Sequence, residues 1–270
     1  MEGPLPALTW ISHHRFWILG LGLTAVVVAV ALGVWFFMLR SSGTQIDLRQ
    51  ALRLYRQGEH APGAGTSGRL PPPGVYRYRT AGGEQLSIGG ISRSFPPTTE
   101  MVVTGPNCAT VMWYPLEQHT EGLVVCPVGN RALAMTSATS DEEIAGVRTV
   151  DTFHCPNGAY FLPPDPAHAG RWHTTCRGMG QHVEFTGKVL GGSRVQVGGR
   201  WFPTVHVRLT LSFSGSESGT NPTDYWVSTQ DGLILQERET VDVGEASGPF
   251  GAVRYSEQVR LAIDSVAPIR

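Results

Sequence analysis

Residues that could do chemistry are most concentrated between positions 154 and 182. Three histidines there could bind a metal together with a carboxylate such as Asp165 or Glu184. Their spacing matches no established ligand pattern, and oxidised cysteines would be lost as ligands. We therefore predict a disulfide-stapled, irregular loop, without a metal ligand or a cofactor. The histidines in question are His154, His173 and His182.

The four cysteines predict two disulfides. None lies in a Cys-x-x-Cys pair, so a zinc ribbon or a thioredoxin-type motif is not indicated. Cys108 and Cys126 lie in apolar runs on either side of an expected hairpin loop, at nearly paired positions. Cys155 and Cys176 bracket the loop rich in proline and histidine. We therefore predict Cys108–Cys126 and Cys155–Cys176, which favours an oxidising compartment.

No catalytic motif is recognisable, so no catalytic residue is predicted. The segment 215–219 resembles a nucleophile elbow, but Glu217 stands where serine is required. A P-loop, a dinucleotide fingerprint and a His-Glu-x-x-His motif are all missing from the sequence. The net charge of −1 also gives no reason to expect nucleic acid as a partner.

Acidic residues interrupt two otherwise apolar strand rows. Glu257 lies in the apolar row of 252–263, and Glu237 and Glu239 share the row of Leu235. Buried acids are costly unless they are paired or face a wet cavity. They predict either the mouth of a ligand pocket or ion pairs with arginines on neighbouring strands.

Apolar and polar residues alternate along the segments that carry these side chains. This period of two predicts an all-β antiparallel domain over 75–270. The clearest strand is 205–213, where five odd positions are apolar and four even positions are polar. Glycine-rich breaks, including 191–192, predict hairpins between strands of a curved sheet or half-barrel. A parallel α/β sheet is not indicated, because no long helical period separates the strands. The remaining strands are expected near 84–89, 100–104, 108–114, 122–128, 131–138, 147–153, 181–190, 193–198, 224–230, 233–243 and 252–264.

The segment Trp226-Val-Ser-Thr-Gln-Asp-Gly-Leu233, followed by alternation through Val243, is similar to one in bacterial envelope proteins. Over roughly 180–266 the chain resembles the half-barrel domains of lipoprotein carriers and related membrane-tethered proteins. The resemblance implies a curved sheet around an apolar cavity that takes acyl chains. It assigns no individual site residues.

Residues 16–39 predict a transmembrane helix that anchors the chain. The stretch is 24 residues long without a charge, follows a short tail at 1–15, and carries aromatic residues near both ends. A helix of this length reaches about 36 Å, enough to cross a hydrocarbon core of about 30 Å. Within it a stripe of small residues could allow close helix packing, although such residues are also common in these helices. The stripe consists of Ala25, Ala29 and Gly33.

Residues 40–74 are expected to connect the anchor to the β domain. A helix over 45–56 would place Arg49, Arg53 and Arg56 on one face, either against lipid phosphates or in a solvated stalk. A proline- and glycine-rich linker follows the helix. Arginines after the anchor outnumber those before it, which would place the β domain inside the cell. The cysteines argue for the outside, so we expect an extracytoplasmic domain tethered to the plasma membrane.

The sequence predicts a function without identifying a reaction. We expect a non-enzymatic domain that binds an envelope lipid or another apolar ligand. The alternative is a scaffold subunit that contacts a membrane protein through the anchor or the sheet edge. A hydrolase or metal enzyme is a third alternative. A cavity of several hundred Å³ would favour the first function, and a filled core the second.

Overall fold

The chain divides into two units, residues 1–42 and 43–270. Of the expected anchor only Val28, Ala29 and Gly33 are described, and all three are helical. The rest of 16–39, with Ala25, and the whole tail lie outside the described residues. Within the described part of the chain, no helix combines the length and hydropathy that crossing a bilayer requires. The computed structural model describes residues 28–29, 33, 43–58, 70–87, 91–129, 132–144, 147–178, 181–215, 217–248 and 251–270.

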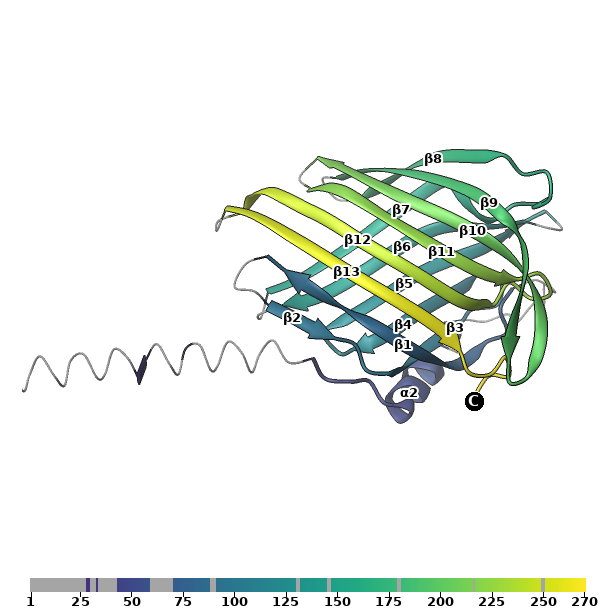
Figure 1. Ribbon diagram of the computed structural model, residues 1–270, viewed down its shortest axis with the longest axis horizontal. Helices are drawn as coiled ribbons and strands as arrows, with labels where there is room; N and C mark the ends of the chain where they lie inside the picture. Colours follow the sequence, from purple (N-terminus) through teal and green to yellow (C-terminus); the bar gives the residue numbers. More distant parts are fainter. Residues whose placement is uncertain are drawn as a thin grey trace, which may run out of the picture. The chain divides into compact units, whose positions relative to one another are not determined.

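The second unit is an antiparallel β structure with one short helix (Figure 1). Its elements are α2 Leu48–Gly58, β1 Gly74–Leu86, β2 Ile91–Ser94, β3 Thr98–Thr104, β4 Ala109–Leu116, β5 His119–Val128, β6 Ala132–Ile144, β7 Val147–Leu162, β8 Arg171–Gly178, β9 Gln181–Val197, β10 Arg200–Gly215, β11 Glu217–Ser228, β12 Ile234–Gly248 and β13 Gly251–Ile263.

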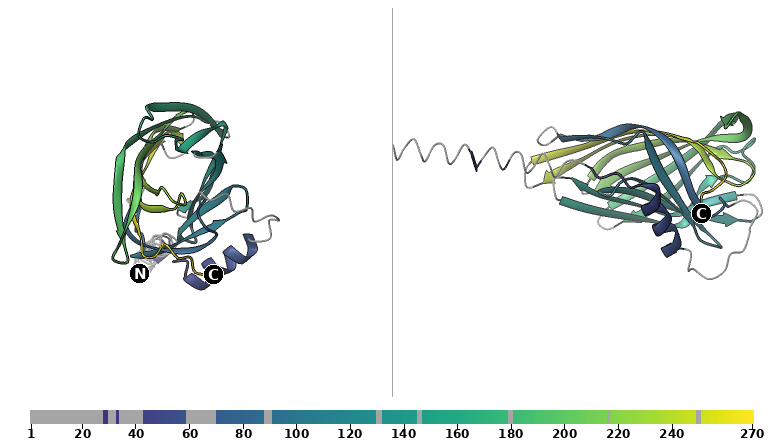
Figure 2. Two further views of the ribbon diagram at one scale, coloured as in Figure 1. Left: turned by 90° about the vertical axis from the view of Figure 1, so that its right-hand side faces the viewer. Right: turned by 90° about the horizontal axis from the view of Figure 1, so that it is seen from below.

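The sheet closes into a barrel because β1 pairs on both sides. From β3 to β13 each strand pairs with the next one along the chain. The first half of β1 pairs with β3, and its second half pairs with β13 from Tyr78↔Ile263 to Leu86↔Tyr255. Twelve strands thus form the wall, seen end-on in Figure 2, while β2 adds only to the end of β1. The expected half-barrel is therefore wrong, although the antiparallel meander is confirmed.

Alternation along the strands fills the interior with apolar side chains. In β10 the odd positions from Val205 onward point inward, and Val205, Val207 and Leu209 are buried. The aromatic rings of Phe161 on β7 and Tyr225 on β11 lie 5.1 Å apart. Since β8, β9 and β10 separate these two strands in the sheet, the rings meet across the interior.

Two expected irregular regions are strands instead. The expected loop over 154–182 is largely β7 and β8, and only 163–170 connects them. The expected break at 191–192 lies inside β9, where the register against β10 shifts and leaves Leu190 as the extra residue of a bulge. Gly191 has φ 142°, so the glycine absorbs the bulge without ending the strand.

Both expected disulfides form. Cys108, just before β4, bonds Cys126 on β5, and Cys155 on β7 bonds Cys176 on β8. Each therefore links neighbouring strands. The second disulfide does not close an irregular loop, as expected, but joins the strands β7 and β8. These two strands share a single register pair, His154↔Arg177.

The helix α2 packs on the outside of the barrel. Ala51 and Tyr55 are buried in a small cluster with Val75 of β1 and Val102 of β3. The apolar face of the helix is thus covered by the barrel wall. Its three arginines, Arg49, Arg53 and Arg56, are exposed, and their contact with a bilayer stays a prediction.

Candidate functional site

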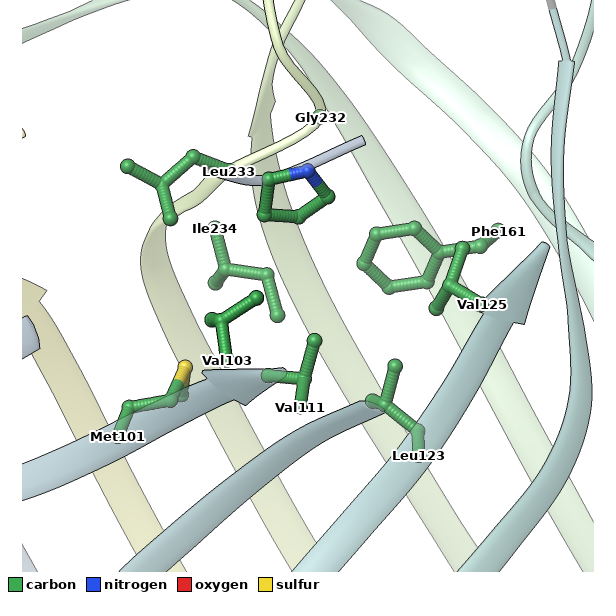
Figure 3. Close-up of a pocket in the computed structure, with 10 residues that line it drawn as sticks. Met101, Val103, Val111, Leu123, Val125, Phe161, Gly232, Leu233 and Ile234 are labelled. Atoms are coloured by element: carbon green, nitrogen blue, oxygen red, sulfur yellow. The ribbon is translucent and has the colours of Figure 1, made fainter. Parts of the chain in front are cut away.

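One end of the barrel interior is apolar and filled. A cavity there is lined by Met101, Val103, Val111, Phe161 and Leu233 among others (Figure 3). The free space at its centre is about 10 Å³ for a water-sized sphere, roughly the space that one water molecule occupies. The cavity therefore has no room for an acyl chain.

The other end of the interior is polar. Its side chains come from β1, β2, β5, β6 and β13. His119 on β5 approaches Glu257 on β13, and β4, β3 and β1 separate these strands in the sheet. The contact therefore crosses the interior of the barrel. We call the following residues the polar cluster: Glu84, Arg93, His119, Glu121, Glu142, Tyr255 and Glu257.

Glu84 contacts three other residues of the polar cluster. Its Oε2 lies 2.8 Å from His119 Nδ1 and accepts a hydrogen bond of 2.9 Å from the Tyr255 hydroxyl. Its Oε1 pairs with the guanidinium of Arg93, which also donates to the Glu143 carbonyl oxygen. Both side chains of the Glu84–Arg93 pair are almost fully buried. A carboxylate held in this way is fully partnered, as buried charge requires.

Aromatic rings fix the imidazole of His119. The rings of Phe95 and Trp113 approach it edge-on, with centroids 5.3 Å and 5.8 Å away. The Trp113 indole in turn donates a hydrogen bond of 2.8 Å to Thr99 Oγ1. His119 is fully buried, so its ring has one orientation with Nδ1 on Glu84 and Nε2 toward the other carboxylates.

His119 Nε2 and Glu257 Oε1 are buried without hydrogen-bond partners. The Nε2 atom lies 3.4 Å from Glu121 Oε1 and 3.9 Å from Glu257 Oε2. Glu142, held by the Ser140 hydroxyl at 2.8 Å, completes a group whose potential ligand atoms lie within 4.8 Å of one another. Within the described ranges this is the group that could hold a metal ion. Buried atoms without partners are uncommon and mark a position where something can bind.

The charges in the polar cluster shift its pKa values in opposite directions. Burial alone would raise the pKa of Glu84, but His119 and Arg93 outweigh burial and lower it. Burial would lower the pKa of His119, but Glu257, Glu121 and Glu84 raise it well above its usual range. Burial raises the pKa of Glu142 to about 7 and that of Glu257 well above its usual range. The cluster therefore holds protons near neutral pH.

Glu237 and Glu239 on β12 form a second acidic pair beside this cluster. Both are buried, and Asn221 donates a hydrogen bond of 2.6 Å to Glu239 Oε1. Burial and the charge of Glu121 raise the pKa of Glu239 to about 8. Burial, with the charge of Glu239, raises the pKa of Glu237 well above its usual range. Two adjacent buried carboxyl groups cannot both ionise, so the pair holds a proton at neutral pH.

The acids predicted from the sequence lie in the interior, and the histidines do not gather. Glu237, Glu239 and Glu257 are all buried, and none of them forms an ion pair with arginine among the described residues. His154, His173 and His182, the possible ligands that were not predicted to bind a metal, are exposed on β7, β8 and β9.

Sequence reasoning missed most of the polar cluster. Glu84 continues the buried row of Tyr76 and Tyr78 along β1, so extending that alternation would have found it. The expected hairpin loop over 115–122 includes His119, whereas only residues 117 and 118 separate β4 from β5. No signal in the sequence brings His119 to Glu84, because their meeting depends on how the sheet curves from β1 through β3 and β4 to β5.

Comparisons with known proteins assign no family to the chain. No protein-family model matches the chain, and no curated protein matches it. A solved structure, the hypothetical lipoprotein YmcC from Escherichia coli (K12), is 12% identical. It aligns over 84% of this chain and 100% of its own chain with a TM-score of 0.33. A likeness of this size assigns no function.

Proposed function

We propose that this chain is a non-enzymatic binding protein of the cell envelope that holds a small polar or charged ligand at the polar end of its barrel. The observation that carries the proposal is the pair of buried, unpartnered atoms His119 Nε2 and Glu257 Oε1. Both lie in a site whose other groups are already fixed by hydrogen bonds. Preformed sites with a few convergent polar groups are typical of ligand binding.

An acyl chain is a less suitable ligand. The apolar cavity has space for about one water molecule. A bound acyl chain would need Leu233, Ile234 and their neighbours to move apart. An apolar fluorophore titrated into the protein tests this point: we expect no saturable binding, and saturable binding would restore the lipid as ligand.

The disulfides support a location outside the cytoplasm, and the apolar stretch 16–39 supports a membrane tether. Two disulfides are stable in an oxidising compartment, and the uncharged stretch 16–39 would tether the domain to the plasma membrane. A periplasmic phosphatase fused to the C-terminus should be active. Activity of a cytoplasmic reporter alone would instead favour the orientation that the arginines indicate.

A scaffold role is the second candidate, and the filled apolar end of the barrel favours it. Large apolar side chains are exposed on several strands, with Trp201 the most exposed among the described residues at 55%. Barrel closure leaves little free sheet edge for a partner strand, since β1 and β13 pair with each other. Contact would therefore use side chains or the anchor.

Native mass spectrometry of the detergent-extracted chain separates the candidates. A small added mass that is lost on denaturation supports ligand binding. Co-purification of a second subunit without such a mass supports the scaffold. A bare monomer under the same conditions contradicts both.

A further inference from the structure

We propose that the polar end of the barrel binds one divalent transition-metal cation of the first row, such as Zn²⁺. Its ligands are His119 Nε2 and the carboxylates of Glu121, Glu142 and Glu257. This inference rests on the proposed function, since it names the class of ligand for the same site.

The four ligand groups already converge. Their potential ligand atoms lie within 4.8 Å of one another, although they come from β5, β6 and β13. Bonds from zinc to nitrogen or oxygen are about 2.0–2.2 Å long, so the four ligand atoms around a tetrahedral ion lie about 3.4 Å apart. The side chains must therefore draw together by about 1 Å to surround an ion, which rotation of the carboxylates allows.

His119 is oriented as a metal ligand. Its Nδ1 is hydrogen-bonded to Glu84 at 2.8 Å, which leaves Nε2 for the carboxylate group. Nε2 is fully buried and unpartnered, and it points toward Glu121 and Glu257. Imidazoles that bind metals almost always make such a second hydrogen bond, because it fixes the tautomer and the ring.

The charge balance of the site calls for a cation. Arg93 is committed to Glu84 and to the Glu143 carbonyl. Among the described residues no lysine or arginine pairs with Glu121, Glu142 or Glu257. Three carboxyl groups converge there on one imidazole, and a divalent ion would balance their charge when they are ionised.

The mixture of ligands favours a transition metal over calcium or magnesium. Calcium takes six to eight oxygen ligands, and magnesium keeps several waters. One imidazole nitrogen with three carboxylates suits zinc, iron or manganese better. An entry path lies on the side of Glu121 and Glu142, which are partly exposed, whereas His119 and Glu257 are closed off.

Calorimetric titration of Zn²⁺ into the full-length, detergent-solubilised chain, after metal removal with a chelator, tests the site. We expect one Zn²⁺ per chain. Glu121→Gln and Glu142→Gln should each raise the dissociation constant for Zn²⁺ about tenfold or more. Asp141→Asn is the matched control, because Asp141 neighbours Glu142 on β6 but pairs with Arg148. It should leave the affinity unchanged.

A second measurement, the melting temperature, distinguishes loss of metal binding from misfolding of a variant. Zn²⁺ should raise the melting temperature of the parent and of Asp141→Asn, and should raise that of Glu121→Gln by less at the same Zn²⁺ concentration. The melting temperatures without metal show whether each variant folds. His173→Gln tests the exposed pair with Glu184, whose nearest atoms are 4.0 Å apart.

Three outcomes overturn the proposal: no stoichiometric binding by the parent, unchanged affinity in both glutamine variants, or loss of binding in His173→Gln alone. Failure of the metal site and failure of the proposed function are distinguishable. If zinc does not bind but the native protein still carries a small non-covalent ligand, only the metal assignment falls. If neither is found, the binding function falls as well.

Discussion

Glu84 and His119 form a hydrogen bond of 2.8 Å that crosses the barrel interior. Glu84 belongs to β1 and His119 to β5, with β3 and β4 between them in the sheet. Both side chains are buried, and this bond ties β1 to β5. Arg93, opposite Glu84 on β2, adds a hydrogen bond to the Glu143 carbonyl on β6. The polar cluster therefore contributes to stability as well as to binding.

Arg93→Gln should strongly destabilise the barrel. The change leaves Glu84 buried beside His119 without its guanidinium, and breaking a buried pair in this way typically costs about 3–5 kcal/mol. The control is Arg254→Gln, whose pair with Asp242 is exposed and should matter little. Urea unfolding of both variants measures the difference. Equal losses of unfolding free energy in the two variants would show that the buried Glu84–Arg93 pair stabilises the fold no more than the exposed pair does.

Stability should fall as the pH rises from about 5 to about 8. The folded pKa of Glu239 is about 8, and that of Glu237 is also raised, whereas an unfolded glutamate titrates near 4.5. The folded chain then holds protons that the unfolded chain loses, so each step up in pH favours unfolding. Thermal unfolding measured across this pH range tests whether the stability falls, as expected, or rises.

Glu239→Gln should make that pH dependence shallower, because it removes one of the two coupled carboxyl groups. Part of the slope should remain, since the raised pKa of His119 acts in the same direction. Glu184→Gln changes an exposed acid and should leave the slope as in the parent. A Glu239→Gln slope as steep as that of the parent would contradict the role assigned to the pair.

Removing the Cys155–Cys176 bond by a double alanine substitution should cost about 3 kcal/mol in the chain-entropy account of cross-links. The two residues are 21 positions apart. The bond also joins strands with little other register pairing, so β7 and β8 should separate locally. Hydrogen exchange would show faster exchange there than in β10. Non-reducing peptide mapping that joins Cys108 to Cys155 or Cys176 would refute the pairing itself.

The arginines of α2 should strengthen binding to anionic vesicles without stabilising the fold. Replacing Arg49, Arg53 and Arg56 by glutamine should weaken vesicle binding by about fivefold per arginine at low salt. The unfolding midpoint should not change, because these side chains are exposed. Tyr55→Ala should instead lower the unfolding midpoint and leave vesicle binding unchanged, since the ring is 4% exposed and packs on the barrel. Equal binding to neutral and anionic vesicles would reduce the helix to a spacer.

Local patterns predicted the strands better than they predicted the site. Alternation identified 205–213 and 252–263, because one face of each is buried. The expected strand at 147–153 is the first half of β7, whereas the second half of β7 and all of β8 lie in the expected loop, because the prolines and histidines of 154–182 are typical of one. Closure and the polar cluster could not be predicted, since the pairing of Tyr78 with Ile263 spans most of the chain and leaves no local trace.

Pairing of β1 with β13 sets the order in which the fold can be completed. Strands β4 to β13 can each pair with the strand made just before, and β3 pairs with β1, but the second half of β1 must wait for β13, residues 251–263. Contacts so distant in sequence slow folding, because a long loop must close first. Until the last strand arrives, Glu84 lacks Tyr255 and the interior lacks Glu257. A ribosome that stops before residue 251 would therefore release a chain in which the second half of β1 has no partner strand and the barrel wall stays open.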